Sequence, residues 1–120
     1  MIQPDLCHCG GITECKKVAA YAETRYIQVA PHNPQGPVST AAAAHLGMAI
    51  PNFLILEYVH SPHRERVLRE PWVVQNGRLQ APDYPGLGVD IDEDAVLASP
   101  MRPNTKAGGT CASDGSVADV

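Results

Sequence analysis

Val29-Ala30-Pro31-His32-Asn33-Pro34 joins a short apolar run to a histidine held between two prolines. The apolar run from Tyr26 to Ala30 predicts a buried strand. Proline fixes its own φ and pushes the preceding residue into extended geometry, so the backbone around His32 is expected to be stiff. In β/α proteins catalytic groups sit at the carboxyl ends of the strands. The stretch therefore predicts a strand that presents His32 at its C-terminal end.

Two further segments have the same character. Met1–Leu6 is predicted to be the end of a strand with Asp5 at its tip, and the nearly all-apolar Asn52–Tyr58 predicts a strand buried on both faces, with Glu57 near its end. Asp5 precedes His32 by 27 residues and Glu57 follows it by 25, which is one β/α unit each time. Because parallel strands in register end at one rim, the spacing predicts that these three side chains converge.

Helices are predicted between these strands. From Ile12 to about Arg25, apolar residues recur at three- and four-residue spacings, namely Ile12, Cys15, Ala19, Ala22 and Tyr26. Ser39 or Thr40 is expected to cap a short alanine-rich helix that runs to Leu46 and ends at Gly47. The alternation of strands and helices predicts an α/β fold with three parallel strands.

The pattern changes after the third strand. His60 to Arg66 predicts a polar loop or short helical turn, and Trp72–Gln80 predicts a hairpin with Asn-Gly as its two-residue turn. Asp92 begins a predicted helical turn through Leu97, and the residues from about 100 to 120 are expected to be loosely held. We therefore divide the chain into residues 1–60, 61–98 and a flexible tail, 99–120.

The chain has 120 residues, a formal net charge of −4 and four cysteines (Cys7, Cys9, Cys15 and Cys111). It shows no basic face suited to nucleic acid, no apolar stretch near the roughly 18 residues that cross a bilayer, and no secretory signal. The cysteines are too few and too clustered for a disulfide framework. We expect free thiols in a reducing compartment, the cytoplasm.

Four motifs carry a family likeness: Gln3-Pro4-Asp5-Leu6, Gly10-Gly11-Ile12-Thr13-Glu14, Ala30-Pro31-His32-Asn33-Pro34, and Gly86-Leu87-Gly88-Val89 with Asp92. Together they resemble the C-terminal part of acid-sugar dehydratases of the enolase superfamily, in the mandelate racemase branch and its galactonate dehydratase-like subgroup. The similarity covers about residues 2–97 and extends to the Asp114–Asp119 segment.

The resemblance implies a capping domain and a modified (β/α)7β (TIM-like) barrel, of which this chain would supply strands six to eight. Asp5 and His32 match the family's Asp–His dyad, and Glu57 matches the acidic residue on strand eight. The hairpin and residues 86–92 match the tail that returns to the cap. The family's Mg²⁺ carboxylates lie on strands three to five, which are absent here, so no metal ligand is expected in this chain.

The implied activity is that of a carbon–oxygen hydro-lyase acting on a small-molecule sugar acid. It removes the proton α to the carboxylate and expels the β-hydroxyl to give a 2-keto-3-deoxy acid, with Mg²⁺ stabilising the enediolate. His32 would be the acid/base, and Asp5 would fix its tautomer. Glu57 would join His32 in contacting substrate by hydrogen-bonding the substrate carboxylate. The full-length enzyme is expected to be a homo-oligomer.

Other interpretations stay open. A racemase or cycloisomerase of the same superfamily would use the same dyad without elimination. A non-catalytic module would complete a partner or bind a metal through Cys and His, although Cys7-His8-Cys9 with Cys15 lacks the paired spacing of a zinc site. The remaining candidates are expected to be surface or helix-face residues: His45, His60, His63, Arg64, Arg66 and Arg69. The alternative for His60 and His63 is that they line the mouth of the pocket, and the alternative for the arginines is sugar-acid recognition, which their spacing does not support.

The chain is too short to form a complete barrel. A barrel of this class takes about 250 residues, so three strands cannot close one. One strand edge and much of the lumen side would stay exposed. We therefore expect the isolated chain to be inactive and to be a truncated reading frame or gene fragment.

Overall fold

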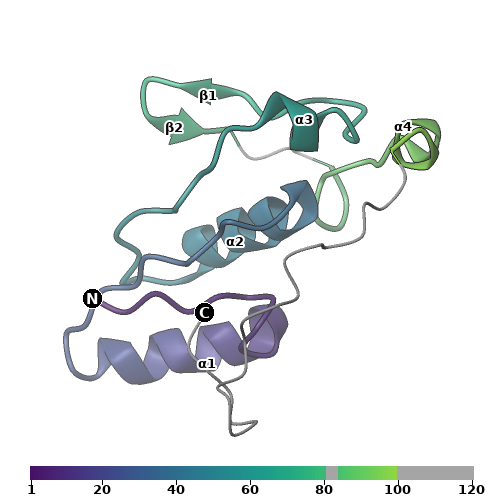
Figure 1. Cartoon of the computed structure of the whole chain (residues 1–120). Coiled ribbons are helices and arrows are strands. Elements are labelled where there is room, and N and C mark those ends of the chain that lie inside the picture. Colours follow the sequence, from purple (N-terminus) through teal and green to yellow (C-terminus); the bar gives the residue numbers. More distant parts are fainter. Residues whose placement is uncertain (81–83, 100–120) are drawn as a thin grey trace, which may run out of the picture.

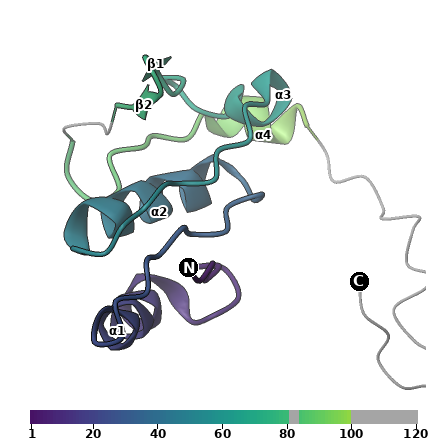
Figure 2. The same ribbon diagram turned by 90° about the vertical axis from the view of Figure 1, so that its left-hand side faces the viewer.

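The computed structural model describes residues 1–80 and 84–99. Its helices and strands are α1 (Gly11–Glu23), α2 (Pro37–Ala49), α3 (Pro62–Glu65), β1 (Val74–Gln75), β2 (Arg78–Leu79) and α4 (Glu93–Leu97). Figures 1 and 2 show α2 lying between α1 and the β1–β2 hairpin. Cys111 and nearly all of the predicted flexible tail fall outside the described residues.

The three segments predicted as strands run parallel, with the His32 segment in the middle. Ile2 pairs with Val29, Asp5 pairs with His32, and Val29 pairs with Phe53, all in parallel orientation. The pairs form isolated bridges and not regular strands. Because the first two pairs share one register, Asp5 and His32 are held at the same level, as the spacing predicted.

Helix α1 forms where the apolar spacing predicts it. Its buried residues are Cys15, Ala19 and Ala22. The predicted role of Tyr26 is wrong, since this side chain is 99% exposed and its φ is 56°. Tyr26 lies in the closing turn of the helix, where the Ile27 N–H donates to the Ala22 carbonyl (3.0 Å). The middle parallel segment therefore starts after Tyr26.

Helix α2 begins earlier than predicted. Its first residue is Pro37 and its N-cap is Gly36, so neither Ser39 nor Thr40 caps it. Proline suits this first position because its φ is already helical and its missing N–H would have no partner there. The two hydroxyls are thereby placed inside the first turn, where they are free to bond elsewhere.

Helix α2 also runs past Gly47, which was expected to end it. A Cβ atom at Gly47 would lie 2.9 Å from the ring of Phe53. Glycine at this position thus lets the third parallel segment approach the helix, because any side chain would meet the aromatic ring.

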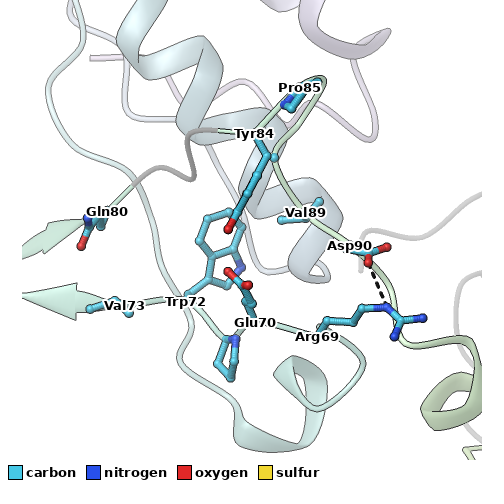
Figure 3. Close-up of a pocket in the computed structure, with 11 residues that line it drawn as sticks. Arg69, Glu70, Trp72, Val73, Gln80, Tyr84, Pro85, Val89 and Asp90 are labelled. Atoms are coloured by element: carbon cyan, nitrogen blue, oxygen red, sulfur yellow. Dashed lines mark ion pairs between the residues drawn. The ribbon is translucent and has the colours of Figure 1, made fainter.

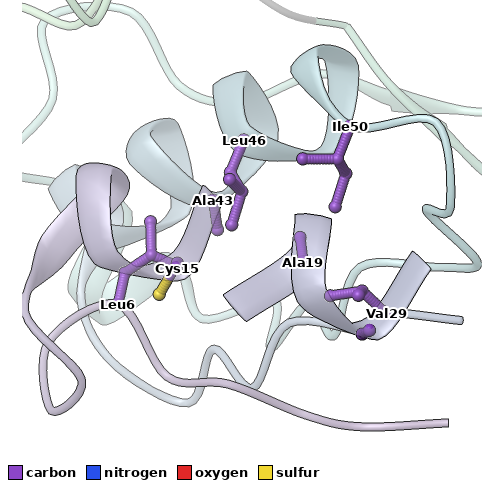
Figure 4. Packing of buried hydrophobic residues seen from close by; sticks show 8 residues of the cluster. Leu6, Cys15, Ala19, Val29, Ala43, Leu46 and Ile50 are labelled. Atoms are coloured by element: carbon purple, nitrogen blue, oxygen red, sulfur yellow. The ribbon is translucent and has the colours of Figure 1, made fainter. Parts of the chain in front are cut away.

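Two apolar clusters hold the chain together. The first joins α1, α2 and the parallel segments (Figure 4) and consists of Leu6, Cys15, Ala19, Ala22, Val29, Ala43, Leu46 and Ile50. The second joins α2 to the hairpin region through Ala41, Leu68 and Trp72. The expectation that Asn52–Tyr58 is buried on both faces is wrong for this chain, since Ile55 is 62% exposed. In the described residues this segment is bridged only to the Val29 segment.

In the C-terminal part, the turn and helix-capping residues adopt the local structure that their residue types predict. Asn76 (φ 53°) and Gly77 (φ 71°) form the predicted two-residue turn between β1 and β2. The Asp92 side chain caps α4 by accepting from the Ala95 N–H (3.1 Å).

In the part of the chain that is described, no helix has both the length and the apolar character needed to cross a bilayer. The divisions at residues 60 and 98 stay predictions.

Candidate functional site

Asp5 and His32 form a hydrogen-bonded pair at the ends of neighbouring parallel segments. Oδ2 of Asp5 lies 2.8 Å from Nδ1 of His32. The Asp5 side chain is only 9% exposed, whereas the imidazole is 46% exposed. The carboxylate thus belongs to the packed base of the site, and the ring faces the solvent-accessible side where a substrate would approach.

Glu57 lies on the other side of the imidazole. Its Oε2 is 3.8 Å from Nε2 of His32, too far for a hydrogen bond. The same oxygen accepts a hydrogen bond from the Asn33 backbone N–H (2.9 Å). The ring therefore stands between two carboxylates, bonded to one through Nδ1 and facing the other through Nε2. The structure brings together all three residues that the sequence singled out.

The surroundings of Asp5 stabilise the ionised form of its carboxyl group. Burial by itself raises the pKa of this carboxyl, but hydrogen bonds from His32, the Cys7 N–H and Gln35, with the nearby His8, outweigh it and hold the pKa below its usual value. Oδ1 accepts from the Cys7 N–H at 2.7 Å. Since an ionised carboxylate only accepts hydrogen bonds, Nδ1 of His32 must carry the proton. In the neutral ring, Nε2 is then the basic nitrogen.

Sequence reasoning missed the polar network behind this pair. Asn33 is buried, and its Nδ2 donates to the Glu57 carbonyl (3.1 Å) and to Oγ1 of Thr40 (3.0 Å). Oγ of Ser39 donates to Oδ1 of Asn33 (3.0 Å). Asn33 thereby ties the third parallel segment to the first turn of α2. The signal was present in the sequence, because the two prolines bracket Asn33 as tightly as His32.

Gln35 is a second residue that the sequence analysis missed. Its Nε2 lies 3.3 Å from Oδ2 of Asp5 and 3.2 Å from Nε2 of His8. His8 itself is exposed, with Nε2 3.9 Å from the same carboxylate oxygen. The Gln35 and His8 side chains place positive partial charge beside Asp5, and this charge favours the ionised form of the Asp5 carboxyl.

The other histidines lie outside the dyad. His60 contacts the buried Glu65 through Nδ1 (3.2 Å), and Nε2 of His45 lies 3.2 Å from the Leu87 carbonyl oxygen. Glu65 also accepts from the Tyr58 hydroxyl (2.7 Å). His63 is exposed, as predicted. These contacts fasten the segment after Glu57 and the loop at Leu87 to the core.

Arg64, Arg66 and Arg69 are exposed, as predicted, and each also makes polar contacts that the sequence did not predict. Arg64 donates to the carbonyls of Pro34 and Gln35, the latter at 2.9 Å. Arg66 donates to Oγ of Ser99 (2.6 Å), and Arg69 pairs with Asp90 (2.9 Å). Guanidinium groups present five donors in a fixed fork, so they bridge loop carbonyls readily. Arg64 in particular braces the loop that follows the dyad histidine.

The described residues do not fit a metal site. No three His, Cys, Asp or Glu side chains within them are arranged to hold an ion. Both Asp5 oxygens and one Glu57 oxygen already accept hydrogen bonds. The Cys7 thiol contacts Ser39, whereas the Cys9 thiol contacts Cys15, so the two thiols point to different partners.

A cavity of about 790 Å³ lies apart from the dyad, at the hairpin (Figure 3). It is lined by Arg69, Glu70, Trp72, Tyr84, Val89 and others, and includes none of Asp5, His32 and Glu57. The convergent titratable groups are therefore at the rim of the parallel segments and not in this cavity.

Comparison with known proteins gives a consistent result. Residues 1–95 match the family described as "Enolase C-terminal domain-like". The chain is 43% identical over 108 residues to a D-xylonate dehydratase of Haloferax volcanii, covering 88% of this chain and 26% of that protein. It is 38% identical over 128 residues to a D-galactonate dehydratase of Ralstonia pickettii, covering 99% and 34%. The chain thus spans about a quarter to a third of the length of these relatives.

A solved structure agrees with these matches. A mandelate racemase/muconate lactonizing enzyme from Jannaschia sp. CCS1 superposes with a TM-score of 0.79 at 40% sequence identity, covering 85% of this chain and 26% of that one. The arrangement of parallel segments and helices seen here is therefore that of part of a barrel enzyme.

Proposed function

Since the chain belongs to the enolase C-terminal domain-like family and resembles its galactonate dehydratase-like members, we propose that it is the part of an acid-sugar dehydratase that carries the proton-transfer groups. The proposed substrate is a sugar acid, and the proposed product is a 2-keto-3-deoxy acid. The complete enzyme would be a hydro-lyase, a cytoplasmic homo-oligomer by expectation.

The hydrogen bond between Asp5 and His32 is the observation that carries this proposal. It leaves Nε2 of His32 as a base on the exposed side of the ring. A proton α to a carboxylate is only weakly acidic, so its removal needs a base positioned within hydrogen-bond reach. Nε2 would take that proton, and the Asp5 carboxylate would stabilise the imidazolium. The imidazolium would then return the proton to the departing β-hydroxyl.

Glu57 would complete the substrate contact. Its carboxyl group lies 3.8 Å from Nε2 and is fixed by the Asn33 N–H, so it borders the space in front of the proposed base. We assign Glu57, as the protonated carboxylic acid, to donate a hydrogen bond to the substrate carboxylate as negative charge develops there. The divalent metal expected for this family would be held by residues outside this chain, and for that reason the isolated chain is proposed to be inactive.

A chimera tests the proposal. Residues 1–95 of this chain would replace the matched segment of the H. volcanii D-xylonate dehydratase, and formation of the 2-keto-3-deoxy acid would be measured. The chimera is expected to turn over, and His32→Asn is expected to lower kcat on the order of 10²–10⁴-fold. His63→Asn is the matched control, because His63 is exposed and outside the dyad.

The chimera also distinguishes a dehydratase from a racemase. The racemase alternative stays open because a similar solved structure is named a mandelate racemase/muconate lactonizing enzyme. Stereochemical inversion of the α-carbon without loss of the hydroxyl would favour a racemase. Full activity of His32→Asn in an active chimera would refute the assigned base in either case. The isolated chain, assayed with Mg²⁺ and the same acids, is expected to show no turnover.

A further inference from the structure

Cys9 and Cys15 form a dithiol pair that the proposed reaction does not use. Their Sγ atoms are 2.7 Å apart, and both thiols are free. A disulfide has its sulfur atoms about 2.05 Å apart, so only a small adjustment separates the pair from a bond. From this geometry we propose that Cys9 and Cys15 are a site of reversible disulfide formation. The proposal is independent of the proposed function.

The fold holds the two thiols in place from both sides. Cys15 is fully buried in α1 and belongs to the first apolar cluster. Cys9 lies in the turn before α1, where its N–H donates to the Asp5 carbonyl (2.9 Å). Gly10 follows with φ 98°, a left-handed conformation that turns the chain back toward the helix. The proximity of the sulfurs is therefore a property of the folded turn and not of six-residue spacing alone.

The two thiols differ in reactivity. Burial, a hydrogen bond with Cys9 and the nearby Cys9 and Asp5 charges raise the pKa of the Cys15 thiol to about 12, so it does not start the exchange at neutral pH. Cys9 is half-buried and is the accessible member of the pair. Cys7, although exposed, points away to Oγ of Ser39 (3.4 Å).

A low-molecular-weight disulfide is the oxidant. The Cys9 thiolate attacks one of its sulfurs, forming a mixed disulfide and releasing one small thiolate. Cys15 then attacks the Cys9 sulfur while its proton passes to the departing sulfur, which leaves as the second small thiol. Two protein thiols are oxidised and one external disulfide is reduced.

Mapping of the product tests the proposal. The Cys111→Ser chain would be incubated with glutathione disulfide at neutral pH, alkylated, cleaved after Glu14 and sequenced by fragmentation mass spectrometry. Cleavage after Glu14 separates Cys15 from Cys7 and Cys9. We expect a Cys9–Cys15 linkage with an alkylated Cys7, reversed by dithiothreitol. The same reaction in urea should distribute the linkages among the three cysteines.

Matched variants sharpen the result. Cys7→Ser is expected to retain the linkage, and Cys9→Ser is expected to abolish it. A dominant bond from Cys7, glutathione adducts without an internal bond, or the same distribution in native buffer as in urea would each overturn the proposal. The map of the Cys111→Ser chain decides the question even where one of these variants fails to fold.

Discussion

Asp5 and His32 are paired twice, once through a parallel backbone bridge and once through a 2.8 Å hydrogen bond between Oδ2 and Nδ1. The backbone pairing sets the level of the two side chains, and the carboxylate then sets the rotation of the ring. This double constraint leaves Nε2 as the basic nitrogen on the exposed side.

Removal of the Asp5 charge should weaken the control that Asp5 has over the tautomer and charge of the His32 ring. Asp5→Asn keeps the oxygen that accepts from the Cys7 N–H but loses the anion that holds Nδ1 protonated and stabilises the imidazolium. In the active chimera we expect kcat to fall by about 10²-fold, within the range for positioned acid–base groups. Asp94→Asn, in α4, is the matched control. Unchanged kcat in Asp5→Asn would show that the carboxylate does not act through the ring.

Removal of the Asn33 side chain should destabilise the chain. Asn33→Ala removes the donor to the Glu57 carbonyl and the bonds of Asn33 to the Ser39 and Thr40 hydroxyls, in a buried or half-buried place. We expect the free energy of unfolding to fall by about 1–3 kcal/mol, measured by urea titration. Gln28→Ala, an exposed position, should change it little. Equal effects of the two substitutions would mean that the network contributes nothing.

Glu65 should make stability depend on acid pH. Burial raises the pKa of this carboxyl, but the hydrogen bonds from Tyr58 and Ser61 and the contact with His60 outweigh it and lower the pKa from its ordinary 4.5. A group whose pKa is lower in the folded state stabilises it above the unfolded pKa, and this stabilisation is lost as the pH falls through the folded value.

The matching experiment compares Glu65→Gln with the parent chain. We expect a loss of about 1–3 kcal/mol in the free energy of unfolding at neutral pH, shrinking as the pH falls below about 4.5. Glu70→Gln, at an exposed site, should show no such trend. A Glu65→Gln deficit that is constant across pH would argue against a charged Glu65 in the folded state.

The order and direction of the parallel segments could be predicted from the sequence, because apolar runs that recur after 27 and 25 residues are a property of successive β/α units. The convergence of Asp5, His32 and Glu57 followed from the same spacing. The hairpin turn was equally readable, since Asn76 and Gly77 suit the positive φ that the turn requires.

Other features depended on contacts that no local pattern shows. The start of α2 was set by Pro37 and not by a hydroxyl cap, and its continuation through Gly47 depended on the ring of Phe53 in another segment. The bonds of Arg64 to the Pro34–Gln35 carbonyls join residues about 30 positions apart. Such long-range polar contacts have no sequence period, and this is why Gln35 was missed; Asn33 lies between the same two prolines as His32, but its partners could not be predicted.

The central claim is that Asp5 holds His32 with the proton on Nδ1 and the basic lone pair on Nε2. Long-range ¹H–¹⁵N correlation of the imidazole rings at neutral pH measures this tautomer directly in the 120-residue chain. We predict that neutral His32 is the Nδ1–H form and that Asp5→Asn loses this preference, while His63 is unchanged. A neutral His32 protonated on Nε2 in the parent chain would contradict the claim.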